Sequence, residues 1–472
     1  MFRNYDIRGV VDKDLTPKIV EAIGKAYGTL LHRRKIKQAV VGRDCRLSGK
    51  IFEKSFIKGL TSCGVDVIDL GMVMTQMVYY AQYLFQTNGC CMITASHNPY
   101  NYNGFKLGIS FSLTTGPEEV QEIRSYVEKG NFFKSHKPGK LLKKVNITEK
   151  YYNDVLKRIN LKKKYKIVVD TRHGSVGKYM PEILNRVGCK VIGVNLKVDG
   201  HFPKGTPDPT EEKFMLDLGE IVKKEKADLG IAFDGDGDRI GLVDERGRIL
   251  WNDVVVAIFA KEILERFPKS KIIYNTLCSQ IVTRVVKQNG GIPIMWLTGH
   301  AFIKKKIAEE GAAFGGELSG HFFFNDNAYG HDDGSYACLR LIEYLSEKNI
   351  TLGKLFDTFP KYISSPEIKI GCPDDKKKDV IKDISIKFKK KYSGAKITDD
   401  TVIPGDDGVR ADFSDGMMIF RYSQNGPYIT VKFEAKDKKT YEERRLYVRK
   451  MLHSYPEMIW KDELCVNLHI VE

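Results

Sequence analysis

The sequence predicts an α/β protein with three α/β domains of similar topology, mixed but mainly parallel sheets, and a smaller C-terminal α+β domain. One observation is a unit that occurs three times: a β-branched strand, a polar turn, an amphipathic helix, a glycine and a second β-branched strand. The other is the length of 472 residues, which allows three or four domains of ordinary size. Because strands that alternate with helices form helix-covered parallel sheets, each unit indicates one such sheet.

The three units occupy residues 39–68, 167–192 and 272–294. Each is followed by another apolar strand that ends in a loop of polar residues. In open α/β sheets, ligands bind at the carboxyl ends of the strands. We therefore expect the three loops to converge on a single cleft.

Domain limits are predicted where the pattern changes between units. A basic connector covers residues 140–146, and residues 243–250 are typical of a hairpin. Beyond Pro360 the units give way to alternating strands over 417–421 and 428–434 and a basic helix over 440–452. We predict domains at residues 1–146, 147–248, 249–360 and 361–472.

The composition excludes several classes of protein. A hydrophobic fraction of 42% and a charged fraction of 29% are typical of a soluble globular protein. The net charge of +16 comes from lysines scattered along helical patterns, often beside acidic residues, so we expect solvated faces and no nucleic-acid partner. The chain has no signal-peptide core and no run of about 18 apolar residues, so no membrane partner is expected. Nine cysteines without paired metal-ligand spacing indicate free thiols in the cytoplasm.

The first polar loop contains a candidate nucleophile, the hydroxyl of Ser96. It follows the apolar run 91–93, and a turn formed with Asn98 and Pro99 would explain the same residues without any chemistry. Phosphoryl transfer depends mostly on positioning and charge neutralisation, so a nucleophile needs partners. Lys106, a few residues further on, is a candidate acid/base or phosphate clamp.

The second loop contains three aspartates that alternate with glycine: Asp234, Asp236 and Asp238. Their carboxylates can face one ion, and such hard oxygen ligands suit Mg²⁺ or Ca²⁺. A calcium-binding EF-hand is excluded because its sixth position requires glycine and holds Arg239, and because residues 229–233 are strand-like. We expect one Mg²⁺ per chain, with Arg239 beside it able to pair with phosphoryl oxygens.

Two further loops suggest the substrate. Glu317, Ser319 and His321 follow the third apolar strand and suit the hydroxyls of a polyol. Residues 421–427 offer a guanidinium, a hydroxyl and amides, which suit a phosphate dianion, although an ordinary polar hairpin explains them equally well. Together the first three loops indicate metal-dependent phosphoryl transfer on a sugar.

These motifs closely resemble those of the α-D-phosphohexomutase superfamily, within it the phosphomannomutase/phosphoglucomutase group. The matching stretches are Thr94–Pro99, Asp234–Arg239, Gly316–His321 and the C-terminal Arg-x-Ser loop. The resemblance covers nearly the whole chain and implies four domains around a central cleft. It implies that mannose or glucose 1-phosphate and 6-phosphate are interconverted through a phosphorylated Ser96, with hexose 1,6-bisphosphate as activator and intermediate. The fourth domain is expected to be a mobile lid joined near residues 359–364.

The resemblance also implies the role of each site residue. Mg²⁺ would be bound by the three aspartates and the phosphorylated Ser96, and Lys106 and His321 would transfer protons. Glu317 and Ser319 would contact the sugar hydroxyls. The cleft would be lined by Tyr5, Arg8, Arg239 and His300, and the distal phosphate would be bound by Arg421, Ser423, Gln424 and Asn425. The expected partners are small-molecule hexose phosphates, and the expected assembly is a monomer or weak homodimer.

Two departures and two alternatives accompany this interpretation. Leu277 stands where close relatives carry a substrate-contacting lysine, and Gln424-Asn425 replaces an Asn-Thr pair. Within the superfamily, a phosphoglucosamine or phosphopentose mutase is the alternative. Outside catalysis, a non-catalytic sugar-phosphate-binding relative is possible, although the intact serine, metal and acid/base positions argue against it.

Overall fold

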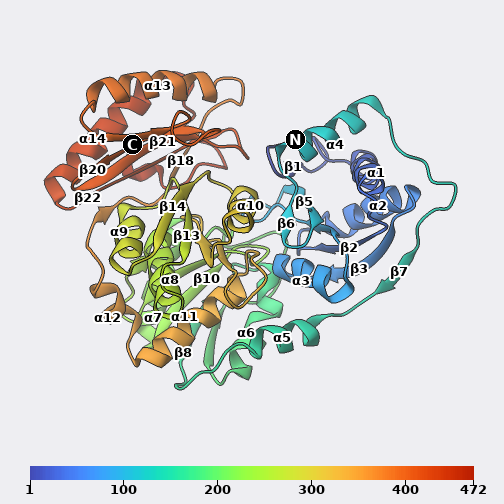
Figure 1. The fold of residues 1–472 in the computed structure, drawn as a ribbon, viewed down its shortest axis with the longest axis horizontal. Helices are drawn as coiled ribbons and strands as arrows, with labels where there is room; N and C mark the ends of the chain where they lie inside the picture. The colour runs from blue at the N-terminus through green and yellow to red at the C-terminus, as the bar shows by residue number, and fades with distance from the viewer.

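A computed structural model describes the backbone of residues 1–472 and every side chain except those of Lys143 and Lys144. The chain forms four sheets in sequence order, each with its own helices (Figure 1). The N-terminal sheet lies on the right of Figure 1 and the C-terminal sheet on the upper left, with the other two below the C-terminal sheet.

The first sheet is built from seven strands in the order β1-β5-β4-β2-β3-β7, with β6 paired to β5. Its residues alternate between two layers of helices: Ala39 and Val41 pack in the cluster formed with α1 and α2, whereas Val40 packs in the cluster that contains α3. The elements are β1 (Ile7–Val10), α1 (Pro17–Arg33), β2 (Gln38–Arg43), α2 (Gly49–Ser62), β3 (Asp66–Met72), α3 (Thr75–Phe85), β4 (Gly89–Ile93), β5 (Tyr102–Ser110), β6 (Leu113–Thr114), α4 (Pro117–Lys129) and β7 (Leu141–Lys144).

The second and third sheets are smaller. The second sheet has the strand order β12-β11-β10-β8-β9. The elements of this part of the chain are α5 (Thr148–Leu156), β8 (Lys166–Asp170), η1 (Ser175–Lys178), α6 (Met180–Arg186), β9 (Lys190–Val194), α7 (Glu212–Glu225), β10 (Leu229–Phe233), β11 (Ile240–Asp244) and β12 (Ile249–Leu250). The third sheet has the strand order β14-β13-β15-β16. The elements of this part of the chain are α8 (Asn252–Arg266), β13 (Lys271–Asn275), α9 (Gln280–Gln288), β14 (Ile292–Trp296), α10 (His300–Glu310), β15 (Phe314–Gly316), β16 (Phe322–Phe324), α11 (Gly334–Lys348) and α12 (Leu352–Asp357).

The three predicted units share one topology, as expected. In each, the two strands of the unit pair in parallel: β2 with β3, β8 with β9, and β13 with β14. The following strand then adds in parallel on the other side of the first: β4, β10 and β15. A fourth strand closes each set antiparallel: β5, β11 and β16. The prediction of three similar α/β domains with mixed, mainly parallel sheets is confirmed, and the three polar loops leave the sheets at equivalent places.

The C-terminal domain is an antiparallel sheet with two long helices. Its elements are β17 (Ile363–Ser364), β18 (Ile368–Gly371), α13 (Lys377–Lys391), β19 (Lys396–Asp399), β20 (Gly408–Phe413), β21 (Gly416–Tyr422), β22 (Tyr428–Ala435), α14 (Lys438–His453) and η2 (Leu468–Ile470). The predicted strands at 417–421 and 428–434 and the helix at 440–452 are confirmed. The side chain of Asp437 caps α14 by accepting a hydrogen bond from the Thr440 amide.

The hydrophobic core is shared unevenly among the domains. One large cluster runs through the first three domains, whereas most apolar residues of the fourth domain form a cluster of their own. Polar contacts contribute to the junction between the third and fourth domains: Lys432 Nζ lies 3.0 Å from Asp253 Oδ2, and Arg410 donates to the carbonyl of Thr276 over 2.6 Å. The fourth domain is therefore the part of the chain best able to move as a unit. The domain limits given above stay a prediction.

Two observations concern the rest of the predictions from composition. All nine cysteines are free thiols. Among the described residues, no helix combines the length and the apolar character that crossing a bilayer requires.

Candidate active site

Ser96 lies in the loop after β4 and is fully buried. Its backbone has a φ of 51°, a left-handed conformation that is uncommon for serine. Buried hydrogen bonds hold this loop: Arg46 donates to the Ser96 carbonyl over 2.9 Å, and the Thr94 hydroxyl accepts from the Ser96 amide over 2.8 Å. Asp44 in turn accepts from both Arg46 and Thr94. The serine is thus positioned by contacts that its short motif did not indicate.

The Ser96 hydroxyl meets the aspartate loop of the second domain. It donates to Asp234 Oδ2 over 2.6 Å, although 138 residues separate the two along the chain. Lys106 on β5 reaches the same loop, where its ammonium donates to Asp236 Oδ2 over 2.8 Å and pairs with Asp238. The nucleophile, lysine and aspartates predicted separately therefore form one cluster.

The three aspartates form a group that could bind a cation. All are fully buried, and one carboxylate oxygen of each lies within 4.8 Å of the others. Burial raises the pKa of the Asp234 carboxyl well above its usual range, and the neighbouring Asp236 and Asp238 raise it further. Among the described residues, Oδ1 of Asp236 and Oδ1 of Asp238 have no hydrogen-bond partner. Buried acceptors without partners are costly, so this loop suits an added divalent cation.

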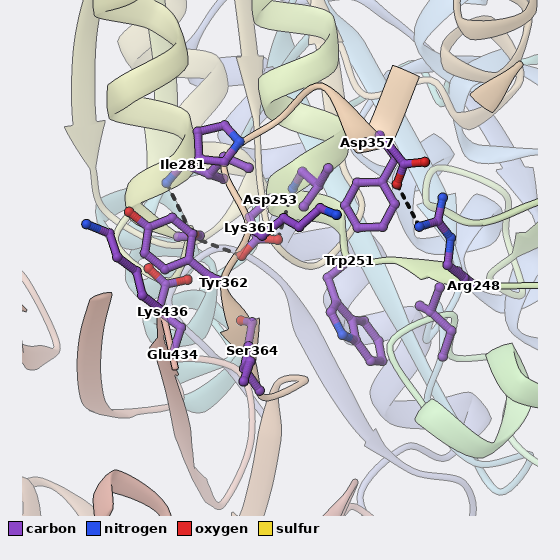
Figure 2. A pocket seen from close by; sticks show the side chains of 16 residues that line it. Arg248, Trp251, Asp253, Ile281, Asp357, Lys361, Tyr362, Ser364, Glu434 and Lys436 are labelled. Atoms are coloured by element: carbon purple, nitrogen blue, oxygen red, sulfur yellow. Dashed lines mark hydrogen bonds and ion pairs between the residues drawn. The ribbon is translucent and has the colours of Figure 1, made fainter. Parts of the chain in front are cut away.

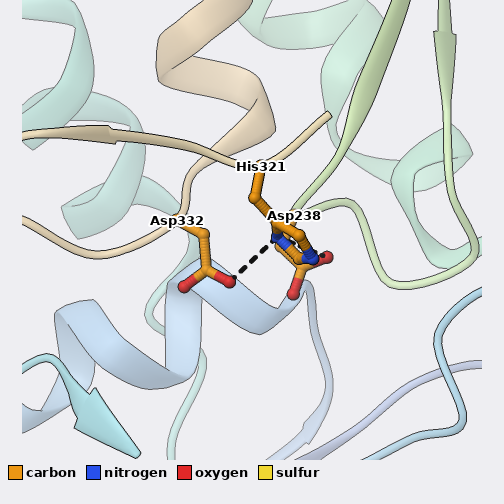
Figure 3. A group of neighbouring side chains, drawn as sticks. All are labelled: Asp238, His321 and Asp332. Carbon is orange, nitrogen blue, oxygen red and sulfur yellow. Dashed lines mark ion pairs between the residues drawn. The ribbon is translucent and has the colours of Figure 1, made fainter. Parts of the chain in front are cut away.

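His321 lies beside three charged residues, and Figure 3 marks its ion pair with Asp332. Its Nδ1 atom is 3.1 Å from Asp332 Oδ2 and 3.8 Å from Asp238 Oδ1, and its Nε2 accepts a hydrogen bond from Arg239 Nε over 2.9 Å. Asp238, His321 and Asp332 also lie close enough to share an ion. However, the three aspartates offer carboxylate oxygens alone, the ligands that a hard cation such as Mg²⁺ prefers, so they are the better candidate for such an ion.

Glu317 and His300 complete the loop side of the cleft. Glu317 is almost fully buried, and its Oε1 accepts from the Gly299 amide over 2.7 Å. The ring of His300 lies 5.0 Å from that of Tyr5 and 5.6 Å from that of His321. These contacts join the N-terminal strand region to the third domain.

The fourth domain contributes the loop between β21 and β22. Arg421 donates from Nε to Asp407 Oδ1 over 2.7 Å, and Gln424 donates to the same carboxylate over 2.7 Å. The Ser423 hydroxyl accepts from the amides of Asn425 and Gly426, both at 3.1 Å. Asp407 thus orients the guanidinium of Arg421, which is predicted to bind the distal phosphate.

All four domains line one small cavity of about 60 Å³. Of the predicted residues, it is lined by Tyr5, Arg8, Lys106, Arg239, His300, Glu317, Ser319, His321, Arg421, Ser423, Gln424 and Asn425. The three aspartates lie next to it, each in contact with Lys106 or Arg239, and Ser96 contacts Asp234.

Sequence reasoning missed several lining residues: His97, Glu367, Lys369 and Tyr428. Lys369 stands within the apolar strand β18, where only an alternating pattern hinted that it faces away from the core, and it pairs with Asp208 over 2.9 Å. Leu277, expected to replace a cleft lysine, is buried in the core and does not line the cavity.

Comparison with known proteins decides the family. Profiles described as phosphoglucomutase/phosphomannomutase, alpha/beta/alpha domains I, II and III match residues 1–134, 149–247 and 251–362. The phosphomannomutase/phosphoglucomutase of Pseudomonas aeruginosa is 38% identical over 452 residues, which cover 96% of this chain and 95% of that protein. This chain belongs to the phosphoglucomutase/phosphomannomutase family. It is therefore a phosphomutase, an enzyme that moves a phosphoryl group within its sugar-phosphate substrate.

Two further members of the phosphoglucomutase/phosphomannomutase family are similar to this chain over nearly its whole length, and a more distant enzyme shares its fold. The phosphoglucomutase of Neisseria meningitidis serogroup A is 35% identical and covers 98% of both chains. The crystal structure of a family protein from Burkholderia thailandensis superposes with a TM-score of 0.85 at 33% identity, covering 96% of this chain and 97% of that one. The N-acetylphosphoglucosamine mutase of Aspergillus fumigatus, solved with GlcNAc-6P and magnesium, has a TM-score of 0.58 at 14% identity, covers 95% and 94% of the two chains, and so shares the fold alone.

Proposed function

We propose that this phosphomutase interconverts the 1- and 6-phosphates of mannose and glucose by passing a phosphoryl group between Ser96 and the sugar. One observation carries the proposal: the buried Ser96 hydroxyl donates to Asp234 over 2.6 Å, which joins a nucleophile from the first domain to the metal-type loop of the second. The names of the relatives support mannose and glucose as the sugars.

The transfer proceeds in two steps. In the first, the Oγ–P bond of phosphorylated Ser96 breaks, and a P–O bond forms to the free hydroxyl of the hexose phosphate, whose proton passes to a base. The product is hexose 1,6-bisphosphate, which also activates enzyme that has lost its phosphate. In the second step the other phosphoryl group returns to Ser96 Oγ, and the base returns the proton to the oxygen that is left.

His321 transfers the proton, and Lys106 neutralises charge on the phosphoryl group. Burial would lower the pKa of Lys106, but Asp236 and Asp238 raise it above its usual value, so the side chain stays an ammonium. We assign Lys106 to neutralising the phosphoryl charge, together with Arg239. His321 is the base, because Nε2 has an unshared pair and its bond to Arg239 can be exchanged for the substrate hydroxyl.

A divalent cation, which we propose to be one Mg²⁺, is bound by Asp234, Asp236, Asp238 and phosphorylated Ser96. The support is the unpartnered buried oxygens of Asp236 and Asp238, since oxygen ligands of this kind suit Mg²⁺. When bound, the ion would offset the negative charge of the transferred phosphoryl group.

The remaining residues position the sugar and its second phosphate. Glu317 and Ser319 meet the ring hydroxyls, and Tyr5, Arg8 and His300 complete the cleft wall. Arg421, Ser423, Gln424 and Asn425 bind the distal phosphate. Lys369 of the fourth domain lines the same cavity, whereas Leu277 is buried away from it.

The test uses mannose, glucose and glucosamine 1-phosphates with a trace of glucose 1,6-bisphosphate. We expect comparable kcat/KM for the two hexoses, because Glu317 and Ser319 have little power to sense the 2-hydroxyl, and much weaker use of glucosamine 1-phosphate. Ser96→Ala should lose several orders of magnitude in rate and the phosphate seen by intact-mass analysis, while Ser110→Ala keeps both. Efficient turnover of glucosamine 1-phosphate with poor use of both hexoses would place the enzyme in another branch.

A further inference from the structure

A second cavity, of about 400 Å³, lies at the junction of the third and fourth domains (Figure 2). It shares no lining residue with the catalytic cavity. Its walls come from the region of β12, the first residues of α8 and α9, the linker at residues 360–364 and the end of β22. Its volume lies in the range of small-molecule sites.

Aromatic rings form much of the wall. Trp251, Phe356 and Tyr362 all line the cavity, together with Ile281 and Ile363; Figure 2 labels Trp251, Tyr362 and Ile281. Trp251, which directly precedes α8, and Phe356, in α12, are half-buried residues of the third domain, whereas Tyr362 belongs to the linker. Such a wall suits a flat ring, which gains contact area at little entropic cost.

Two polar atoms at the cavity lack a hydrogen bond of standard geometry among the described residues: the hydroxyl of Tyr362, and Oε2 of Glu434, whose carboxyl also interacts with the Ser279 hydroxyl. Glu434 is fully buried, and its other oxygen accepts from the Gln280 amide over 3.2 Å. The neighbouring ammonium of Lys432 pairs instead with Asp253 at 3.0 Å. Burial raises the pKa of the Glu434 carboxyl above its usual value, although the nearby Lys432 lowers it in part. Buried polar groups are nearly always hydrogen-bonded, so these two indicate a missing partner.

The rim of the cavity has free positive charge. Lys361 and Lys436 line it and are exposed, and no ion pair or hydrogen bond of either ammonium is found among the described side chains. Arg248, by contrast, is already held by Asp244 at 2.7 Å and Asp357 at 2.8 Å. The two lysines are therefore available to an anionic group.

We propose that this junction cavity is a ligand site for a small aromatic anion, bound with its ring against Trp251 and Phe356, its polar edge on Tyr362 and Glu434, and its anionic group at Lys361 and Lys436. The anionic group is a phosphate or a carboxylate, since both are oxyanions that pair with a lysine ammonium. The site shares no lining residue with the catalytic cleft, and the proposal does not depend on which sugar the enzyme uses.

Occupation of this site bears on the motion of the fourth domain. The ligand contacts the third domain, the linker and β22 at once. Strand β22 runs from Tyr428, which lines the catalytic cavity, to Glu434, which lines this one, a span of roughly 20 Å at the usual rise of a strand. A bound ligand stabilises one orientation of the fourth domain, so it lowers kcat without competing with the sugar phosphate.

The experiment uses the tryptophan of the site as its reporter. The chain has three tryptophans, so Trp296→Phe with Trp460→Phe leaves Trp251 alone in the full-length enzyme. Its emission is followed while AMP, 4-hydroxybenzoate, and their uncharged counterparts adenosine and phenol are added. We expect a saturable change with at least one anion, a dissociation constant about ten-fold lower than that of its uncharged counterpart, and a response that persists with glucose 1-phosphate present.

Paired variants separate charge from structure. Lys361→Ala with Lys436→Ala should weaken anion binding about ten-fold, whereas Lys354→Ala with Lys439→Ala, equal in charge loss but outside the cavity, should leave it unchanged. Tyr362→Phe should weaken binding while leaving the melting temperature the same or higher, because its hydroxyl has no partner to lose. The proposal is overturned by a silent Trp251 with both anions, by equal affinity in the two lysine pairs, or by purely competitive inhibition.

Discussion

Nδ1 of His321 lies 3.1 Å from Oδ2 of Asp332, and this contact fixes how the imidazole can act. Arg239 can only donate, so the Nε2 atom that accepts from it carries no proton. The ring proton is therefore on Nδ1, facing Asp332, while Lys304 holds the other oxygen of Asp332 at 3.1 Å. This arrangement orients the ring so that Nε2, the proposed base atom, faces Arg239.

Asp332→Asn is expected to lower kcat by about 10²-fold or more, the usual contribution of a positioned base, with little change in KM. An amide no longer favours the tautomer that leaves Nε2 free, so the pH profile of kcat should also change. The measurement is kcat across pH, with the exposed Asp375→Asn as control. Because Asp332 acts through His321, adding Asp332→Asn to His321→Gln should cost nothing further; a full additional loss would refute the dyad.

Removal of divalent cations is expected to abolish turnover, and added Mg²⁺ to restore it. Three aspartates with one phosphoserine place about five negative charges in a small buried space, which is unfavourable without a cation. Because Mg²⁺ should bind only the folded chain, it should also raise the melting temperature, and Asp236→Asn should reduce that rise. Full activity after exhaustive chelation would contradict the metal assignment.

The fourth domain is expected to open before substrate enters, since a cavity of about 60 Å³ is below the size of ordinary ligand sites. Asn467 joins this domain to the second: it donates to the Thr210 carbonyl and accepts from the Glu212 amide, both over 2.9 Å. Asn467→Ala should therefore enlarge the radius of gyration of ligand-free enzyme, measured by X-ray scattering, and raise KM.

Ligand at saturation should compact both the native enzyme and the Asn467→Ala variant. The exposed Gln288→Ala, away from the interface, serves as control. Identical scattering profiles with and without ligand would count against a mobile lid.

Stability should respond to pH through Asp406. Burial, and then the neighbouring Asp407, raise the pKa of Asp406 to about 7. The unfolded carboxyl titrates near 3.9, so between these values the folded state holds a proton that the unfolded state has lost. This contribution is fully present below about pH 4 and is lost as the pH rises to about 7, roughly 4 kcal/mol in all.

An asparagine at position 406 is neutral at every pH. The unfolding free energy of Asp406→Asn should therefore exceed that of the native enzyme by more at pH 8 than at pH 4. Urea unfolding at the two values measures the difference, with Asp375→Asn as the exposed control. A gain that does not depend on pH would show that Asp406 is already ionised when folded.

Local patterns in the sequence determined the architecture and the kinds of chemistry. Strand and helix periods, glycine stops and polar turns act over a few residues, so the three repeated units and the loops with Ser96, Asp234 and Glu317 were predictable. The order of these loops also carried the family resemblance. Such features depend on neighbours in the chain, which a sequence shows directly.

Only the tertiary structure decided how these groups act on one another. The contacts of Lys106 with Asp236, and of Lys369 with Asp208, join residues 130 and 161 positions apart. Charge state, tautomer and hydrogen-bond partner depend on such distant neighbours and on burial. Periodicity and turn signals in the sequence carry no information about either. The junction cavity around Glu434 arises for the same reason, since it exists only where separately folded domains meet.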